Sequence, residues 1–153
     1  MGVRNLRLLV GVLLVATVPL GCSGGGSSSL TKHQVVRQAN AICAKANRTI
    51  AGMYRPDPDD SAATAAALEK VTVRQRTELR QLRALVPPEE DASDYGRWLT
   101  QIDLALDQAD ASSGAIVRSN VAAAEEANRR GEQIRTDADR FANAYGMETC
   151  ARG

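Results

Sequence analysis

The chain has 153 residues, of which 44% are hydrophobic and 24% are charged, and its formal net charge is +1. This composition is typical of one soluble domain. A charge so close to neutral argues against nucleic acid as a partner and against a strong electrostatic attraction to anionic lipid.

The first 21 residues have the features of a secretory leader. Arg4 and Arg7 precede an apolar run that ends at Leu20. The run has roughly a dozen residues, whereas a membrane-spanning helix needs about 20. We therefore expect residues 1–21 to be a signal peptide, residues 22–29 to form a flexible Gly/Ser tether, and residues 30–153 to fold as one domain.

The leader ends in Pro19-Leu20-Gly21-Cys22, which resembles the lipobox of bacterial lipoproteins, with Pro19 standing where that family prefers an aliphatic or small residue. The resemblance implies cleavage before Cys22 and acylation of its sulfur, so that membrane lipid is the first partner and the domain lies on the extracytoplasmic face of the cell membrane. Two or three acyl chains give a stable anchor, because each buried methylene contributes about 0.8 kcal/mol. An ordinary secreted protein cleaved nearby is the alternative.

Cys43 and Cys150 are the two remaining cysteines. An even pair in a compartment that permits disulfides predicts a bond between them. Two free buried thiols are one alternative, and a metal pair is another. Metal is disfavoured because His33, the single histidine, has no matching ligand spacing.

Four stretches show helical periodicity, and none shows the alternation of a strand. The first begins with a capping box of Thr31 and Gln34, flanked by Leu30 and Val35 as a hydrophobic staple, and should end at Arg55-Pro56. Its apolar face contains Val35, Ala39, Ile42, Cys43, Ala46, Ile50 and Met53.

The second stretch should begin at Asp60 or Ser61 and end at Pro87-Pro88. One apolar row contains Leu68, Gln75 and Leu82, and the next contains Thr72, Leu79 and Val86. The third stretch follows, with an acidic first turn at 89–91 that suits the helix macrodipole. Its apolar face contains Tyr95, Trp98, Leu99, Ile102, Ala105, Leu106 and Ala109.

A turn is expected at 110–114, before the fourth and longest stretch. The apolar face there contains Ile116, Val117, Val121, Ala124, Ala127, Ile134, Ala138, Phe141, Ala142 and Tyr145. Glu125 with Arg129 and Glu126 with Arg130 are favourable i,i+4 pairs. Gly146 suits the left-handed position after a helix, with Met147 packing back.

Four amphipathic helices with short connections predict an all-α, antiparallel four-helix bundle, closed by a Cys43–Cys150 disulfide. The two cysteine segments, "ANAICAKANRTI" and "ANAYGMETC", resemble those of small secreted or lipid-anchored helical proteins of actinobacterial-type bacteria. What that resemblance implies is a disulfide-pinned bundle of unassigned function, with no catalytic residues to carry over.

The chain offers little for catalysis, metal or cofactor chemistry. His33 is expected to be a solvated residue at a helix start, and no second histidine exists for a nucleophile-base set. Haem held by His33 with Met53 or Met147 is disfavoured, because no haem-attachment motif is present and aromatic residues are few. Calcium at the aspartates of 57–60 is disfavoured because the EF-hand spacing is missing. We expect no cofactor.

The remaining hypotheses concern residues that could bind a partner at the surface. Arg76, Arg80 and Arg83 share one flank of the second helix and are candidates for binding a partner's carboxylates or lipid headgroups; a solvated flank is the alternative. Trp98 and Tyr95 are expected in the core, with a partner-anchoring role as the alternative. The expected function is non-enzymatic: an interaction or envelope-associated module, or alternatively a small-molecule or lipid-binding bundle with an interhelical groove. An enzyme would need convergent titratable groups in a cleft.

Overall fold

The structure is a computed structural model that describes residues 29–53 and 60–152. It contains four α-helices followed by one 3-10 turn. The helices are α1 (Lys32–Ala51), α2 (Ser61–Arg83), α3 (Glu89–Val117) and α4 (Val121–Tyr145), and the turn is η1 (Cys150–Arg152). The leader, Cys22 and the tether up to residue 28 lie outside the described residues, as do Arg55 and Pro56. α1 ends before that expected stop, at Ala51, where the Gly52 N–H donates to the Arg48 carbonyl at 3.3 Å.

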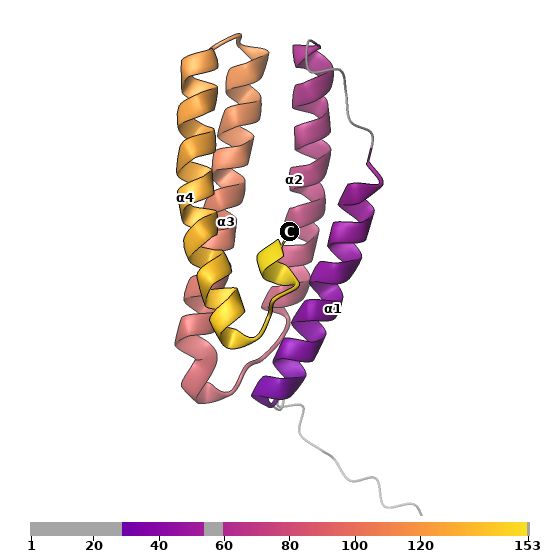
Figure 1. Cartoon of the computed structure of the whole chain (residues 1–153), viewed down its shortest axis with the longest axis vertical. Helices are drawn as coiled ribbons and strands as arrows, with labels where there is room; N and C mark the ends of the chain where they lie inside the picture. Colours follow the sequence, from indigo (N-terminus) through magenta and orange to yellow (C-terminus); the bar gives the residue numbers. More distant parts are fainter. Residues whose placement is uncertain (1–28, 54–59, 153) are drawn as a thin grey trace, which may run out of the picture.

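The helices run alternately up and down, as predicted for an antiparallel bundle (Figure 1). α3 and α4 form the most extensive pair, α2 packs on α3, and α1 packs on α2. The chain after α4 turns back and places η1 between α4 and α1. None of the helices in the described ranges combines the length and apolarity that crossing a bilayer requires.

Local sequence signals set most of the helix ends. The Thr31–Gln34 capping box forms in both directions. The Asp60 side chain caps α2, and Asn120 caps α4 by accepting from the Ala123 N–H at 3.1 Å. Gly146 has a φ of 98°, the left-handed conformation that ends α4 as predicted.

The predicted turn at 110–114 is wrong, because α3 continues through it to Val117. Tertiary contacts support the helix there. Ser112 is buried, and the Ser113 hydroxyl donates to the Ala65 carbonyl of α2 at 3.2 Å. Ser113 therefore contacts the start of α2, and Ser112 is part of the interior instead of a connection.

The α3–α4 connection lies at 118–120 instead. Ser119 adopts a φ of 54°, and its neighbour Asn120 donates its N–H to the Ala115 carbonyl at 2.9 Å. Val117 and Val121, expected on a buried face, flank this turn and are 68% and 67% exposed. They are exposed because they lie at the tip of the α3–α4 hairpin, beyond the core.

α2 also ends earlier than Pro87-Pro88, at Arg83. The residue before a proline is disfavoured in the α region, and the Val86 carbonyl instead accepts from the Leu30 N–H at 2.7 Å. Leu68 and Val86, assigned to the buried rows, are 37% and 40% exposed. Leu79 and Leu82 are buried as expected.

The core lies in the half of the bundle where α1 begins and α4 ends. It consists of Val35, Ala39, Cys43, Leu79, Leu82, Tyr95, Trp98, Leu99, Leu106, Ala138, Ala142, Tyr145 and Met147. The hydroxyl of Tyr95 donates to the Leu82 carbonyl at 3.0 Å, so its one polar group is satisfied in the interior.

The segment after α4 is attached to α1 by a disulfide and by two asparagines. Cys43 and Cys150 are bonded, with their Cα atoms 5.1 Å apart, as predicted. Asn40 donates to the Gly146 carbonyl at 3.1 Å and accepts from the Thr149 N–H at 2.9 Å. Asn47 donates to the Thr149 carbonyl at 3.2 Å. These contacts seat the C-terminal segment against α1.

Candidate functional site

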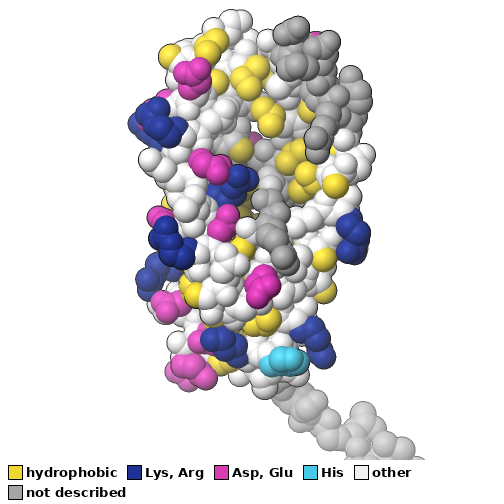
Figure 2. All heavy atoms as spheres, in the orientation of Figure 1, with side chains coloured by type: hydrophobic (Ala, Val, Ile, Leu, Met, Phe, Trp, Pro, Cys, Tyr) yellow, Lys and Arg dark blue, Asp and Glu magenta, His cyan; other side chains and the backbone are white. Residues whose placement is uncertain are grey.

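A groove runs between α2 on one side and α3 and α4 on the other. Its lower part is a cavity of about 90 Å³ above the disulfide, and its upper part is a cavity of about 160 Å³ along the α3–α4 seam. Both cavities are lined by Gln75, Ala105, Leu106 and Arg135. Because the two cavities share these four residues, we call them together the central groove. Figure 2 shows the hollowed face, on which hydrophobic side chains gather in the upper half.

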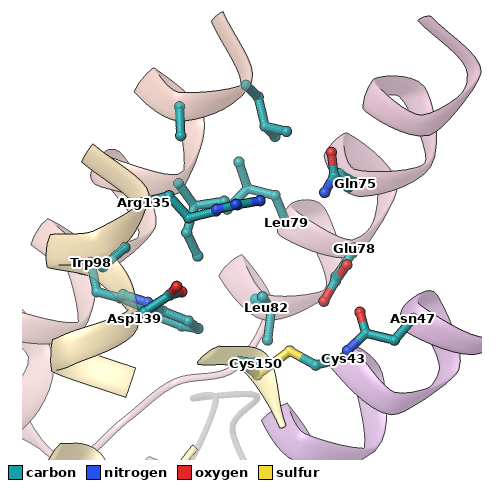
Figure 3. Close-up of a pocket in the computed structure, with 14 residues that line it drawn as sticks. Cys43, Asn47, Gln75, Glu78, Leu79, Leu82, Trp98, Arg135, Asp139 and Cys150 are labelled. Carbon is teal, nitrogen blue, oxygen red and sulfur yellow. A yellow bond between two sulfur atoms is a disulfide. The ribbon is translucent and has the colours of Figure 1, made fainter. Parts of the chain in front are cut away.

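The bottom of the central groove is apolar and covalently closed. Cys43 and Cys150 line it together with Leu79, Leu82 and Trp98 (Figure 3). The C-terminal segment thus forms the end wall of the groove. Higher up, small residues keep the seam between α3 and α4 tight: a Cβ on Gly131 would come within 3.2 Å of the Gln108 Cβ.

Two acidic side chains enter the lower cavity from opposite walls, Glu78 from α2 and Asp139 from α4 (Figure 3). Both are partly buried. Desolvation raises the pKa of the Glu78 carboxyl from 4.5 to about 7, and the charge of Arg74 partly opposes this. Desolvation also raises the pKa of Asp139, against the lowering effect of Arg135. Neither carboxylate has a hydrogen bond or ion pair with a described residue.

Arg135 reaches from α4 across the cavity toward α2 (Figure 3). Its guanidinium is 2.8 Å from the Glu132 carboxylate, so that its charge is already met within α4. Arg74, one helical turn before Glu78, has a buried Nε with no hydrogen-bond partner. The described charged groups around the lower cavity are therefore two carboxylates that are unpaired among these residues, one paired guanidinium and the nearby Arg74.

The three arginines predicted as a partner-binding flank have separate environments. Arg76 contacts three carboxylates of α3: Asp103 at 3.1 Å, and Asp107 and Asp110 each at 2.8 Å. Hydrogen bonds to Asp107 and Asp110 raise the pKa of Arg76.

Arg83 contacts Asp103 at 2.8 Å. The hydrogen bond from Arg83, together with the charges of Arg83 and Arg76, lowers the pKa of the Asp103 carboxyl. Arg80 is exposed and bonds the Thr77 hydroxyl of its own helix. The structure thus uses two of the three guanidiniums to join α2 to α3. Whether this flank also binds a partner remains a prediction.

Other residues singled out from the sequence lie apart from the groove or within the core. His33 is exposed at the start of α1, as expected. Tyr95 and Trp98 are each 2% exposed and belong to the core, with Trp98 also lining the groove. Met147 is fully buried. Asp60 caps α2, while Asp57 and Asp59 lie outside the described residues.

On the fourth helix, Glu126 pairs with Arg130 as predicted. Arg129, expected to pair with Glu125, pairs with Glu126 instead, because the i,i+3 position also brings the two charges together. Across the part of the chain that the structure describes, no group of three or more His, Cys, Asp and Glu side chains converges as metal ligands would.

Sequence reasoning missed the residues that give the groove its character. Glu78 and Asp139 belong to helices with many charged residues, and nothing local marks them as inward-facing. One signal was available: Glu78 is adjacent to the buried Leu79 and three residues from Gln75, itself on a predicted apolar row. Asn40 and Asn47 also flank Cys43 at spacings of three and four, which places all three on one side of a helix.

Comparison with known proteins finds no matching family model, no matching curated protein and no matching solved structure. The lipobox resemblance and the central groove are therefore the two features of the chain that bear on its function.

Proposed function

We propose that this protein is an extracytoplasmic lipoprotein whose helical domain binds a small ligand in the central groove, without catalysing its conversion. The observation that carries the proposal is the groove itself. It joins two cavities, has an apolar floor, and presents a few polar groups from facing helices, which is the usual composition of a small-molecule site.

The groove is favoured over a protein partner at the arginine flank. Arg76 and Arg83 already contact carboxylates of α3, so a partner would have to compete with those ion pairs. Only Arg80 of the three is without a carboxylate among the described residues. Binding of an envelope protein at this flank is therefore the less favoured function.

The lipid anchor rests on the resemblance of residues 19–22 to a lipobox. We expect Cys22→Ala to move the protein from the membrane fraction to the soluble extracytoplasmic fraction, because acylation of that sulfur is the proposed attachment. Cys43→Ala serves as the control, since it removes a cysteine that lies in the folded domain. Continued membrane association of the Cys22→Ala chain, at the wild-type level, would overturn the anchor.

Trp98 provides a reporter for ligand binding. It is the single tryptophan of the chain and lines the lower cavity. We expect its fluorescence to change saturably when the full chain is titrated with compounds that share a four-carbon chain: n-butylammonium, 1-butanol and butanoate. A small alkyl group of this kind is suited to a cavity of about 90 Å³.

A groove-filling variant makes the titration specific. Ala105 lines both cavities, so Ala105→Leu should abolish the response by occupying the space. Ala111→Leu is the matched control, because Ala111 is exposed on the same helix and lines neither cavity. The proposal fails if none of the three compounds gives a saturable response, or if Ala105→Leu responds like Ala111→Leu.

Acid–base catalysis is a second candidate, favoured by the same pair of carboxylates. A carboxyl with a pKa near 7 facing a second carboxyl is the arrangement that general acid–base catalysis uses. Mass spectrometry distinguishes the two functions: a compound that changes Trp98 fluorescence saturably and is recovered unchanged after prolonged incubation with the full chain is bound and not converted. A product that disappears in Glu78→Gln would support catalysis.

A further inference from the structure

The lower cavity contains negative charge that the described part of the fold does not neutralise. Glu78 and Asp139 have no hydrogen bond or ion pair there. Several other carboxylates near this part of the bundle are paired: Asp103, Asp107 and Asp110 with Arg76, and Glu132 with Arg135. Burying a charge without a partner is costly. The two groove carboxylates are therefore poised to receive a cation from outside.

The cations nearby, within the described part of the chain, do not meet this need. Arg135 crosses the cavity but is paired with Glu132 at 2.8 Å. Arg74 acts on Glu78 through its charge, yet the two side chains form no ion pair. Among the described residues around the lower cavity, two acidic groups are unpaired, Arg135 is engaged by Glu132, and Arg74 acts on Glu78 only through its charge. This balance favours a positive ligand over a negative one.

The other walls define the rest of the ligand. The rest of the lower cavity has an apolar lining, made of Leu79, Leu82, Trp98, Ile102 and Leu106. The disulfide forms its end wall. A bare metal ion would leave these walls unfilled, whereas an organic ammonium ion would place its alkyl or ring portion against them. The cavity of about 90 Å³ suits a short group of this kind.

We propose that the central groove recognises an organic cation, with a protonated amine held between Glu78 and Asp139 and a short apolar group packed against Leu79, Leu82 and Trp98. This inference rests on the proposed ligand-binding function and specifies its ligand class. Amine recognition by two acidic acceptors in an apolar site gives charge-assisted hydrogen bonds that are stronger than neutral ones.

The test compares the affinities of a cation, a neutral compound and an anion that share a four-carbon chain. The full chain is titrated at pH 8 with n-butylammonium, 1-butanol and butanoate, and Trp98 fluorescence is the readout. We expect n-butylammonium to bind at least about tenfold more tightly than the other two, as the gain of one charge-assisted hydrogen bond implies. Tightest binding by butanoate would assign the site to anions at Arg135 and overturn the proposal.

Variants connect the preference to the two carboxylates. Glu78→Gln and Asp139→Asn should each weaken n-butylammonium binding about tenfold while leaving 1-butanol binding within about twofold. Glu69→Gln is the matched control, since Glu69 is exposed on the same helix as Glu78 and lines neither cavity. Melting curves of all variants establish that each is folded at the titration temperature.

The outcomes separate this inference from the function on which it rests. If 1-butanol binds as tightly as n-butylammonium and Ala105→Leu abolishes both, the groove is a ligand site but the cation preference is wrong. If n-butylammonium binds tightly but Glu78→Gln behaves like Glu69→Gln, the cation is held elsewhere and the inference falls. If none of the three compounds binds, both proposals fall together.

Discussion

Cys43 of α1 and Cys150 of η1 are bonded although 107 positions separate them in the chain, and the bond forms the end wall of the central groove. The same link attaches α1 to the C-terminal segment, which Asn40 and Asn47 also hold. The disulfide therefore has two roles: it stabilises the fold and it shapes the candidate site.

We expect the Cys43→Ala/Cys150→Ala double variant to lower the free energy of unfolding by about 2–4 kcal/mol, because closing so long a loop restricts the unfolded chain. Urea denaturation measures the difference. Wild-type protein that has been reduced and alkylated is the control and should fall to a similar stability. A loss below about 1 kcal/mol in both samples would mean that the two asparagines and the surrounding packing hold the segment without the bond.

Glu78 makes stability depend on pH in a direction opposite to most carboxylates. Its pKa in the folded protein is raised to about 7 from 4.5, so between these values the folded state holds more protons than the unfolded state. The stability from this group is fully present below about pH 4.5 and is lost as pH rises through 7. Since Glu78 meets solvent at the groove, we expect the loss to be about 1–2 kcal/mol.

Glu78→Gln isolates this effect, because glutamine resembles the protonated acid. The variant should match wild type near pH 4.5 and exceed its stability by about 1–2 kcal/mol at pH 8.5, as measured by urea denaturation at each pH. Glu69→Gln should show no such divergence. A constant difference between Glu78→Gln and wild type at both pH values would show that desolvation does not govern this carboxyl.

The fold could be predicted from the sequence where local signals and periodicity agree. The capping box at Thr31, the Asp60 cap and the glycine at 146 all mark real helix ends, and the even pair of cysteines in the domain predicts their disulfide. The turn predicted at 110–114 is wrong because Ser and Gly favour turns only as a local preference. There, packing of Ser112 and the Ser113–Ala65 hydrogen bond support the helix, and neither is visible in a local pattern.

The candidate site was harder to predict for a related reason. Whether a charged helical residue faces solvent or a groove depends on how helices splay, and here η1 occupies part of the space between α4 and α1. The periodicity placed Leu79 inside correctly but could not show that its neighbour Glu78 borders a cavity. Similarly, helical periodicity places the three arginines on one flank of α2, but it does not show that a row of α3 aspartates faces Arg76.

Arg76 is expected to contribute to the α2–α3 interface through its three carboxylate contacts. Arg76→Met retains most of the aliphatic stem but removes the charge, and we expect a loss of about 1–2 kcal/mol, since a network of partly exposed pairs contributes more than a single one. The loss of stability should be smaller in 1 M salt, because the Debye length falls to about 3 Å and the ion pairs are screened. Arg80→Met is the matched control, because Arg80 bonds only the Thr77 hydroxyl, and it should change stability by less than about 0.5 kcal/mol. Equal effects of the two variants would show that the α3 aspartates add nothing to stability.

Ser119 is expected to be a site where one substitution stabilises the protein. Its φ of 54° is in the left-handed region, which is unfavourable for residues with a Cβ and accessible to glycine without that cost. Relief of this strain exceeds the added freedom of glycine in the unfolded chain, so Ser119→Gly should raise the free energy of unfolding by about 0.5–1 kcal/mol. Ser93→Gly is the matched control, because Ser93 is exposed inside α3, where glycine is a poorer helix former and should lower stability by about 0.5 kcal/mol. The same substitution thus has opposite signs at the two positions, and thermal or urea denaturation measures both. Destabilisation by Ser119→Gly as large as that by Ser93→Gly would place the α3–α4 turn elsewhere and return the 110–114 stretch to consideration as the connection.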